Sequence, residues 1–432
     1  MQIAHLYQLY LKNPVITTDT RKIKEGDIFF ALKGPNFNGN YFAGQALAAG
    51  VAYTVIDEEI NVSDDRIIKT ADALLTLQQL AKYHREQFNC RQDGNNLPFI
   101  AITGSNGKTT TKELVHAVLS PVYKTYTTEG NLNNHIGIPL TLLKIKNDAE
   151  MAVIEMGANN AKEIEGYCKY VQPTHGLITN FGRAHLQGFG SIEGVRKAKS
   201  ELFNYLRDNN GTAFVNADDE FMIKVSQGIK NIISYGTVNG QIKGKILDSS
   251  TFLKVGFMGQ AGLEIIQTQL VGEYNLPNVL AAVTIGKYFN VPEEKIKAAI
   301  ENYSPSNSRS QMIIHGSNRI ILDAYNANPD SMKAAIENFA CMEGNNKIVM
   351  LGAMMELGKE NKHEHEQIID IIKKFNWDKV VLVGNDFRDI KNPFINFENS
   401  TEAKEWFKAK HFQNVHILIK GSRSMQMEKI LE

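Results

Sequence analysis

The chain alternates short apolar runs with longer stretches in which apolar residues recur every three or four positions. The short runs predict β-strands, and the longer stretches predict amphipathic α-helices. We expect strands at 27–32, 52–56, 99–102, 151–154, 175–179, 211–215, 348–351, 380–383 and 417–419. We expect helices at 71–85, 108–119, 195–206, 279–288, 293–302, 331–339 and 363–375. Strands that alternate with helices are typical of parallel sheets covered by helices, so we predict an α/β fold.

Two polar breaks divide this pattern. Residues 89–98 precede a strong strand, and residues 302–310 read Asn-Tyr-Ser-Pro-Ser-Asn-Ser-Arg-Ser, which is typical of a linker. The breaks predict three domains, at 1–90, 91–305 and 306–432. A length of 432 residues agrees with this division, at about 150 residues per domain. Alternating residues in the Gly-rich part of the middle domain predict an inserted β-hairpin at 236–262.

Composition narrows the possible partners. Lys and Arg number 47, and Asp and Glu number 47, so the formal net charge is zero. Because phosphate affinity needs a basic excess, this balance argues against a nucleic-acid partner. The three cysteines are widely spaced, which argues against a disulfide framework. No apolar run approaches the roughly 18 residues of a membrane span, and the first residues do not resemble a signal peptide. We therefore expect a cytoplasmic protein with no membrane span. The sequence leaves the oligomeric state open, and a monomer is the default expectation.

The strongest local signal is a strand that runs into Gly-Ser-Asn-Gly-Lys-Thr-Thr at 104–110 and then into a helix. Gly104 and Gly107 would let the backbone curl so that several N–H groups point inward. Lys108 would neutralise phosphates, and the Thr109 hydroxyl would bind Mg²⁺. The usual P-loop places its first glycine two residues earlier, so this is a shortened variant. A Gly-rich turn that caps a helix is the alternative, and the loop alone leaves kinase, GTPase and ligase open.

Three more polar residues are candidates for metal binding. Glu155 ends an apolar strand, where open α/β sheets bind ligands, and is either a Mg²⁺ ligand opposite Thr109 or a solvated strand end. His185 follows another strand and is either a ligand or a structural or solvated histidine. Lys199 lies in a predicted helix and by itself looks like a surface lysine in a run of charges. The helix at 363–375 carries His363 and His365, which we expect to be solvated.

These residues resemble the Mur ligase family, ATP-dependent ligases that build the peptide of bacterial cell-wall precursors. The family's own phosphate loop has the shortened spacing found at 104–110. Further segments match in order, namely 128–142 (TEGNLNNHIGIPLTL), 155–158 (Glu-Met-Gly-Ala), 180–185, 197–203 and 275–282 (Asn-x-x-Asn-x-x-Ala-Ala).

The string Asp-Ala-Tyr-Asn-Ala-Asn-Pro-Asp-Ser at 323–331 resembles the signature of the members that add D-alanyl-D-alanine to UDP-MurNAc-tripeptide. Segments 19–34, 352–358 and 420–423 also fit. The resemblance implies a small N-terminal α/β domain that binds the UDP-sugar and a central P-loop ATPase-type parallel sheet. It also implies a C-terminal Rossmann-like domain that binds ATP and the amino-acceptor dipeptide.

The chain departs from the family pattern in three places. Residues 38–42 read Asn-Gly-Asn-Tyr-Phe where Asp-Gly-His-x-Phe is frequent, and Ala353 replaces an aspartate. Ser308 stands before Arg309, where the family often has glycine. None of these positions touches the phosphate loop, so we still expect activity.

The resemblance implies roles for individual residues. Catalysis is assigned to Lys108, His185 and Lys199. ATP binding is assigned to Gly104, Ser105, Asn106, Gly107, Lys108, Thr109, Thr110, Asn275, Asn278, Arg309 and Asp323. Substrate binding is assigned to Thr20, Arg21, Lys33, Gly34, Asn133, Asn134, Asn326, Asn328 and Ser331. Two Mg²⁺ ions are assigned to Thr109, Glu155, His185 and Lys199, with Lys199 carried as a CO₂-derived carbamate.

Several alternatives stay open at this stage. Arg309 either reaches phosphates or is a solvated linker charge. Asn326, Asn328 and Ser331 either contact the dipeptide or serve a turn and a helix cap. The implied reaction passes through an acyl phosphate and releases ADP and phosphate. Its rivals are another Mur or folylpolyglutamate-type amide ligase and a P-loop phosphotransferase, and the third residue of the accepted peptide is not identified.

Overall fold

The computed structural model describes residues 2–89, 96–260, 262–306 and 308–432. Most of the predicted break at 89–98, and one residue each of the predicted linker and hairpin insertion, lie outside this description. The chain forms two compact units. The first unit comprises Met1–Ala101, Tyr123–Ala158 and Lys162–Gly176, and the second comprises Ile102–Val122, Asn159–Ala161 and Leu177–Glu432. The predicted boundaries at 90 and 305 remain predictions, because these units divide the chain differently.

The N-terminal part of the first unit is a parallel sheet of order β1-β2-β5-β6, with a small antiparallel hairpin, β3-β4. Phe29 and Ile56 of the sheet pack with Ala43, Ala46 and Leu47 of α2. The strands are β1 Ile16–Thr17, β2 Ile28–Phe30, β3 Lys33–Gly34, β4 Phe37–Asn38, β5 Tyr53–Ile56 and β6 Ile67–Lys69. The helices are α1 Ile3–Lys12, α2 Ala43–Ala48 and α3 Ala73–Glu86.

The rest of the first unit contains two parallel strands, β8 (Thr125–Thr127) and β9 (Met151–Glu155), with helices α5 (Gly137–Leu143) and α6 (Glu163–Val171). A buried arginine ties α3 to the end of α6. Arg85 donates hydrogen bonds to the carbonyls of Val171 (2.9 Å) and Gln172 (2.8 Å). Its guanidinium also lies 3.8 Å from the centre of the Phe99 ring.

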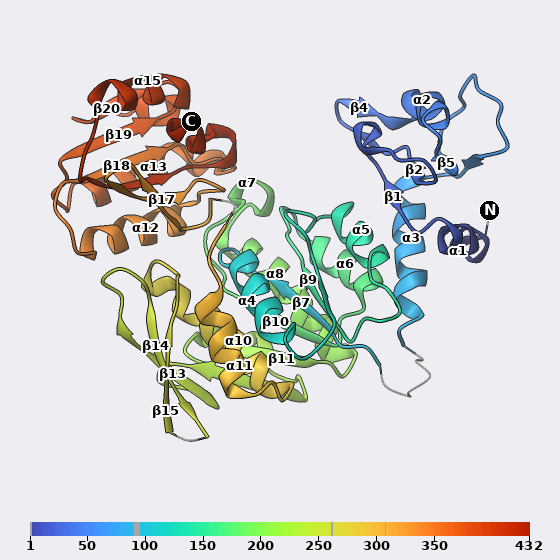
Figure 1. The fold of residues 1–432 in the computed structure, drawn as a ribbon, viewed down its shortest axis with the longest axis horizontal. Coiled ribbons are helices and arrows are strands. Elements are labelled where there is room, and N and C mark those ends of the chain that lie inside the picture. The colour runs from blue at the N-terminus through green and yellow to red at the C-terminus, as the bar shows by residue number, and fades with distance from the viewer. Residues whose placement is uncertain (1, 90–95, 261, 307) are drawn as a thin grey trace. The chain divides into compact units, whose positions relative to one another are not determined.

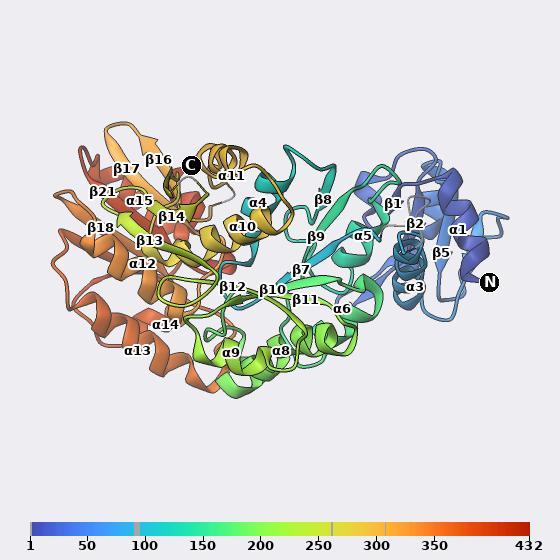
Figure 2. The same ribbon diagram turned by 90° about the horizontal axis from the view of Figure 1, so that it is seen from below.

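Strands β7 (Phe99–Thr103) and β10 (His175–Ile178) begin in the first unit and end in the second. In the second unit the strand order continues from β10 through β11, β12, β13 and β14 to β15. Strand β13 pairs antiparallel with β14, which confirms the predicted hairpin, and β15 extends it. Figure 2 shows α10 on one side of β11 and α8 and α9 on the other.

The remaining elements of this region have the following bounds: α4 Lys108–Leu119, α7 Leu186–Phe189, α8 Ile192–Asp208, β11 Thr212–Asn216, α9 Glu220–Ser226, β12 Asn231–Gly236, β13 Ile242–Asp248, β14 Lys254–Gly259, β15 Gly262–Gln267, α10 Leu276–Tyr288 and α11 Glu293–Asn302.

The C-terminal part of the second unit is a six-stranded sheet of order β16-β17-β21-β18-β19-β20. All neighbours are parallel except β16, which pairs antiparallel with β17. Figure 1 shows α12 and α15 on opposite sides of this sheet. The elements are β16 Gln311–His315, β17 Asn318–Asp323, α12 Pro329–Cys341, β18 Lys347–Gly352, α13 Asn361–Ile372, β19 Lys379–Val383, α14 Asn385–Arg388, β20 Ile395–Phe397, α15 Ser400–Lys410 and β21 His416–Lys420.

The predicted α/β class, parallel sheets covered by helices, is confirmed. The sheets bury apolar strands such as β9, whose five residues are all buried, and β19, whose last four are. Within the described ranges, no helix is long and apolar enough to cross a membrane.

Candidate active site

The phosphate loop joins β7 to α4, and two glycines determine its shape. Gly104 has φ of 141° and Gly107 has φ of 78°, a region that favours glycine. A Cβ on Gly104 would lie 2.0 Å from the hydroxyl oxygen of Thr179. A Cβ on Gly107 would lie 2.7 Å from Oδ1 of Asn278. The backbone therefore occupies space that no side chain could share, and it leads directly into the N-terminus of α4, as phosphate binding requires.

The turn that follows β10 braces this loop from behind. The Ser105 hydroxyl donates to the carbonyl of Gly182 at 2.6 Å. The backbone N–H of Asn106 donates to Oδ1 of Asn180 at 3.0 Å, and the Thr179 hydroxyl donates to the carbonyl of Asn106 at 2.6 Å. These contacts come from side chains and backbone of the protein itself, so they preorganise the loop for phosphate binding.

Lys108 and Thr109, the first residues of α4, provide the charge and the hydroxyl that the loop needs. The Lys108 ammonium donates to the carbonyls of Gly104 (2.7 Å) and Ser105 (3.0 Å), so it lies over the loop. Thr109 is 8% exposed. A cation above the loop and a hydroxyl at its helical end fit a nucleotide phosphate with its Mg²⁺.

The two asparagines predicted to face adenine are both buried at the start of α10. Asn275 donates to the carbonyl of Val271 at 2.9 Å, and Asn278 donates to Oδ1 of Asn275 at 2.9 Å. The Thr111 hydroxyl donates to Oδ1 of Asn278 at 3.0 Å. This chain of bonds links α10 to α4 of the phosphate loop, and a contact with adenine remains a prediction.

His185 lies just after β10 with φ of 53°, and its ring is oriented by a carboxylate. Nδ1 contacts Oε2 of Glu356, and the hydrogen bond lowers the pKa of Glu356. The neighbouring backbone N–H of Gln187 donates to the carbonyl of Glu356 at 3.0 Å. A histidine whose Nδ1 is held by a carboxylate presents Nε2 to a metal, so this geometry fits the predicted ligand.

Lys199 is fully buried in α8, with 0% exposure, so the reading of it as a surface lysine is wrong. Its ammonium lies 5.3 Å from the centre of the Phe189 ring. The helix period places it on the same face as the buried Val195, Ala198 and Leu202, a placement that the charges around it in the sequence conceal.

Glu155 ends β9 in the first unit and is 1% exposed, so it is not a solvated strand end. Its backbone N–H donates to the buried hydroxyl of Thr128 at 2.9 Å. Asn133 donates to Oε1 of Glu155 at 2.7 Å, which orients the carboxylate. In the described part of the chain, no three His, Cys, Asp or Glu side chains form a metal site by themselves.

The Asn-Pro-Asp-Ser segment starts α12 and contacts the phosphate loop. Asn328 and Ser331 form a capping box, with Oδ1 of Asn328 accepting from the Ser331 N–H at 2.9 Å. Nδ2 of Asn328 donates to Oδ1 of Asn106 in the loop at 2.7 Å. The helix-cap alternative is thus correct for these two residues, and their contact with a dipeptide remains a prediction. Asn326 is exposed.

A buried lysine fixes the start of the same segment. Lys420, 2% exposed, donates to Oδ2 of Asp323 at 2.6 Å and to the carbonyl of Asn326 at 3.2 Å. The Arg309 guanidinium lies 3.6 Å from the centre of the Tyr325 ring, so Arg309 is not a free linker charge. Ser308 has φ of 57°, which explains why glycine suits this position.

Arg183 was not predicted, yet it joins the turn after β10 to two C-terminal helices. Nε donates to Oδ1 of Asp330 at 2.9 Å, and its backbone N–H donates to Oδ2 of Asp330 at 2.6 Å. Nη1 donates to Oε1 of Glu364 at 2.9 Å. Burial raises the pKa of Glu364, and Arg183 opposes that rise. The only signal in the sequence was its place two residues before His185.

The family of the chain follows from comparison with known proteins. The Mur ligase family, catalytic domain, matches residues 14–85, the Mur ligase middle domain matches 102–286, and the Mur ligase, glutamate ligase domain, matches 308–423. The UDP-N-acetylmuramoyl-tripeptide--D-alanyl-D-alanine ligase of Bacillus subtilis (strain 168) is 34% identical over 431 residues, covering 96% of this chain and 92% of the relative. The chain belongs to the Mur ligase family.

Solved Mur ligase structures agree with this fold over nearly all of the chain. MurF from Acinetobacter baumannii has a TM-score of 0.87 at 31% identity and covers 98% of this chain and 97% of its own. MurF from Thermotoga maritima, solved in complex with ADP, has a TM-score of 0.84 at 25% identity with the same coverage. The predicted resemblance is therefore confirmed for all three regions of the fold.

The Mur ligase substrate residues predicted in the first unit lie in a short 3₁₀ helix, in the β3-β4 hairpin and in the loop before α5. Thr20 and Arg21 open a short 3₁₀ helix, and the Arg21 guanidinium bonds Asp19 and lowers its carboxyl pKa to about 2. Lys33, next to the exposed Gly34, lies 3.2 Å from carboxylate oxygens of both Asp57 and Glu58. Oδ1 of Asn134 accepts from the Gly137 N–H at 2.9 Å at the start of α5. Their substrate contacts remain predictions.

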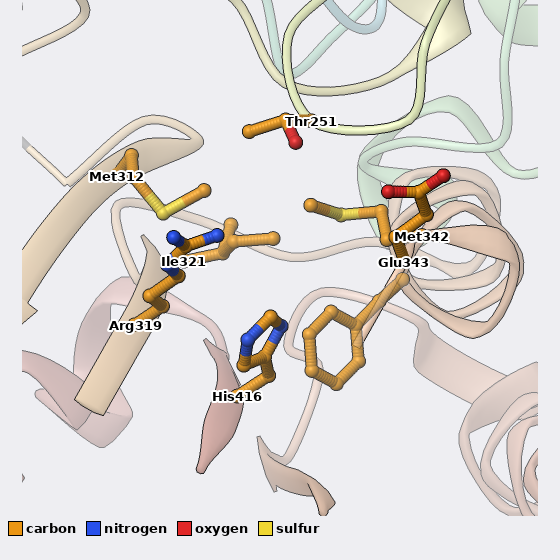
Figure 3. Close-up of a pocket in the computed structure, with 8 residues that line it drawn as sticks. Thr251, Met312, Arg319, Ile321, Met342, Glu343 and His416 are labelled. Atoms are coloured by element: carbon orange, nitrogen blue, oxygen red, sulfur yellow. The ribbon is translucent and has the colours of Figure 1, made fainter. Parts of the chain in front are cut away.

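A small cavity lies between residues of the C-terminal sheet region and the turn that joins β13 to β14 (Figure 3), and none of the predicted site residues lines it. Its volume of about 10 Å³ suits about one water molecule. Burial, together with Arg319 and Lys347, lowers the pKa of His416 in its wall. The residues that line it are Thr251, Met312, Arg319, Ile321, Phe339, Met342, Glu343 and His416. A space of this size cannot hold a nucleotide or a dipeptide.

His363 is exposed, as expected, but His365 is buried, so the expectation of a solvated residue is wrong for it. Nε2 of His365 accepts from the Met354 N–H at 3.1 Å, and Nδ1 lies 2.8 Å from the Asn361 carbonyl oxygen. His365 therefore secures α13 against the turn that carries Glu356. This is a structural role.

Proposed function

We propose that the chain is an ATP-dependent ligase that joins D-alanyl-D-alanine to UDP-MurNAc-tripeptide, giving UDP-MurNAc-pentapeptide, ADP and phosphate. The names of relatives that share over nine-tenths of its length support this activity. The observation that carries the proposal is the 2.7 Å bond between Asn106 and Asn328. It joins a phosphate-binding loop to the segment whose sequence resembles a D-Ala-D-Ala signature, as a ligase needs and a simple phosphotransferase does not.

The chemistry has two steps. The terminal carboxylate of the tripeptide attacks the γ-phosphorus of ATP, and the bond to the β,γ-bridging oxygen breaks to release ADP and an acyl phosphate. The amine of D-alanyl-D-alanine then attacks the acyl carbon, loses a proton, and expels phosphate. Both steps bring anions together, so the protein's task is charge compensation and positioning.

Residues of the chain divide this task. Lys108 would move from the loop carbonyls to the β- and γ-phosphates, where its charge is needed. The N–H groups of the loop would hold the phosphates, and Asp323, fixed by Lys420, would accept hydrogen bonds from the ribose. Two Mg²⁺ ions, held by Thr109, Glu155, His185 and a modified Lys199, would neutralise phosphate charge.

Lys199 suits modification because it is buried. An uncharged lysine amine attacks CO₂, forms a carbamate and releases one proton. The carbamate provides hard oxygen ligands for Mg²⁺, which an ammonium cannot. In protein equilibrated with ¹³C-bicarbonate and Mg²⁺, a carbamate carbon signal should appear by NMR. The signal should be absent in Lys199→Ala and present in Lys197→Ala, the control for an exposed lysine of the same helix. Its absence from the unmodified sequence would overturn this part.

The activity is tested by incubating the protein with ATP, Mg²⁺, UDP-MurNAc-tripeptide and one amine acceptor at a time. We expect a pentapeptide product by mass with D-alanyl-D-alanine, and none with D-glutamate, L-lysine or meso-diaminopimelate, the acceptors of rival amide ligases. Tripeptides ending in lysine and in meso-diaminopimelate, assayed in parallel, identify the accepted third residue. Ligation of another acceptor, or phosphoryl transfer without an amide product, would contradict the proposal.

A further inference from the structure

Arg183 is the point at which three parts of the second unit meet. It follows Gly182, whose carbonyl accepts from Ser105 of the phosphate loop at 2.6 Å. Its side chain contacts Asp330 at the start of α12 and Glu364 at the start of α13. The Arg183 side chain is one-third exposed, whereas the Glu364 side chain is 6% exposed. The pair is thus only partly exposed to solvent. Charge-assisted hydrogen bonds at such a partly buried position keep more of their strength than on a fully exposed surface.

The geometry of the Asp330 contact is that of a clamp. Nε and Nη2 of Arg183 lie 2.9 and 2.8 Å from Oδ1 of Asp330, and the backbone N–H lies 2.6 Å from Oδ2. A Cβ on Gly182 would lie 2.9 Å from Oδ2 of Asp330 and 3.0 Å from Nδ2 of Asn106. The glycine therefore lets the side chains of Asp330 and Asn106 lie close to the backbone at 182, and Arg183 holds Asp330 there in one orientation.

The clamp acts on the part of α12 that faces the phosphate loop. Asp330 lies between Asn328, which bonds Asn106, and Ser331, which completes the capping box. Asp330 and Glu364 both occupy the first turns of their helices, where the helix dipole already favours a carboxylate. Neither helix needs the arginine to begin, so the arginine's distinct contribution is to fix both helix starts relative to the loop.

We propose that Arg183 is a positioning residue for the amide-forming step: it holds the first turn of α12 at the phosphate loop, so that the acceptor amine meets the acyl phosphate. This inference rests on the proposed function. If it is correct, loss of Arg183 leaves phosphorylation of the tripeptide largely intact but lets the acyl phosphate react with water. Phosphate is then released without a matching amide.

The test compares the ratio of pentapeptide formed to phosphate released in Arg183→Ala and in the unmodified protein. We expect the KM for D-alanyl-D-alanine to rise about ten- to thirtyfold, as for loss of a partly buried charge pair, with the ratio falling clearly below one. The KM for ATP should change less than threefold. Arg388→Ala, which removes an exposed arginine–glutamate pair at 3.3 Å in the same unit, is the matched control and should leave all three values unchanged.

Two further variants distinguish a loss of positioning from the effect of leaving the Glu364 carboxylate buried without its cationic partner. Arg183→Lys keeps one charge but cannot span two carboxylates, so it should fall between the unmodified protein and Arg183→Ala. In Arg183→Ala/Glu364→Gln the buried carboxylate is neutral. If the ratio of pentapeptide to phosphate returned to one in this double variant, the unpaired Glu364 would have caused the defect, and the proposal would be overturned. We expect this ratio to stay low, because Asp330 still lacks its contacts with the Arg183 side chain. If Arg183→Ala does not fold, Arg183→Lys and Asp330→Asn give the same comparison.

The outcomes distinguish this inference from the proposed function. If the unmodified protein forms no pentapeptide, the proposed function fails before any variant is compared. If it does, and Arg183→Ala keeps its coupling ratio or loses all parameters equally, only the positioning role fails.

Discussion

The phosphate loop at 104–110 and the segment at 323–331 lie at one site, but different forces shape them. The loop is shaped by its backbone, through two glycines at positive φ and a helix that starts within it. The segment is shaped by side chains that are remote in sequence: Lys420 on Asp323, 97 residues away, and Arg183 on Asp330, 147 residues away. Both regions receive contacts from residues that are remote in sequence, but only the loop also depends on glycines of its own that no other residue could replace.

The largest effect should come from the phosphate loop. Gly104→Ala would place a Cβ 2.0 Å from the Thr179 hydroxyl at φ of 141°. We expect the free energy of unfolding to fall by about 3 kcal/mol or more and ligation to be lost. Chemical denaturation measures the first and product mass the second. Gly166→Ala, in α6 with no atom within 4 Å of the new Cβ, is the control and should be neutral or slightly stabilising. A stable, active Gly104→Ala would show that the loop tolerates a side chain.

A smaller loss is expected when the segment loses its buried cation. Lys420→Met leaves Asp323 without its 2.6 Å partner, so stability should fall by about 2 kcal/mol and the KM for ATP should rise. Lys373→Met removes a mostly exposed pair with Asp370 and should cost less than about 0.5 kcal/mol. Denaturation curves and ATP titrations of both variants check this. Equal costs for the two lysines would mean that the segment does not depend on Lys420.

Two helix caps allow the site to be separated from helix stability. Asn328→Ala and Asn399→Ala each remove an N-cap asparagine that accepts from a backbone N–H, of Ser331 and of Glu402 respectively. Each should cost about 1 kcal/mol of stability. Only Asn328→Ala also loses the bond to Asn106, so only it should weaken ligation. Steady-state kinetics beside thermal melts give the comparison, and similar activity in the two variants would remove Asn328 from the site.

The smallest effect should come from Ser331→Ala. It removes one acceptor, Oγ, which receives the Asn328 N–H at 3.1 Å, while the other half of the capping box remains. We expect a loss of about 0.5 kcal/mol in the free energy of unfolding. A much larger loss of activity than of stability would contradict this expectation and would support the predicted contact of Ser331 with the dipeptide.

The same contrast explains what the sequence could predict. Helices at 108–119 and 293–302 match the structure to the residue, because their apolar period and turn signals are local. Strands in the core, such as β9 and β19, match to within one residue, because each is a continuous apolar run.

The features that the sequence did not predict depend on contacts between residues that are distant in the chain, and no local pattern indicates these contacts. Lys199 sits among charged neighbours in the sequence, yet its helix face is buried. His365 of α13 likewise has charged neighbours in the sequence but is buried, and it accepts a hydrogen bond from a backbone N–H eleven residues away. Arg183 carries no motif, and its role arises only when the fold brings α12 and α13 to the turn after β10.

The most direct test of a ligase site shared by both regions is phosphate release from ATP in the presence of UDP-MurNAc-tripeptide, with and without D-alanyl-D-alanine. The account predicts that rapid release requires both substrates and that each phosphate is matched by one pentapeptide. Release at the same rate without the dipeptide, with no pentapeptide by mass, would contradict it, because the phosphate loop would then act independently of the segment at 323–331.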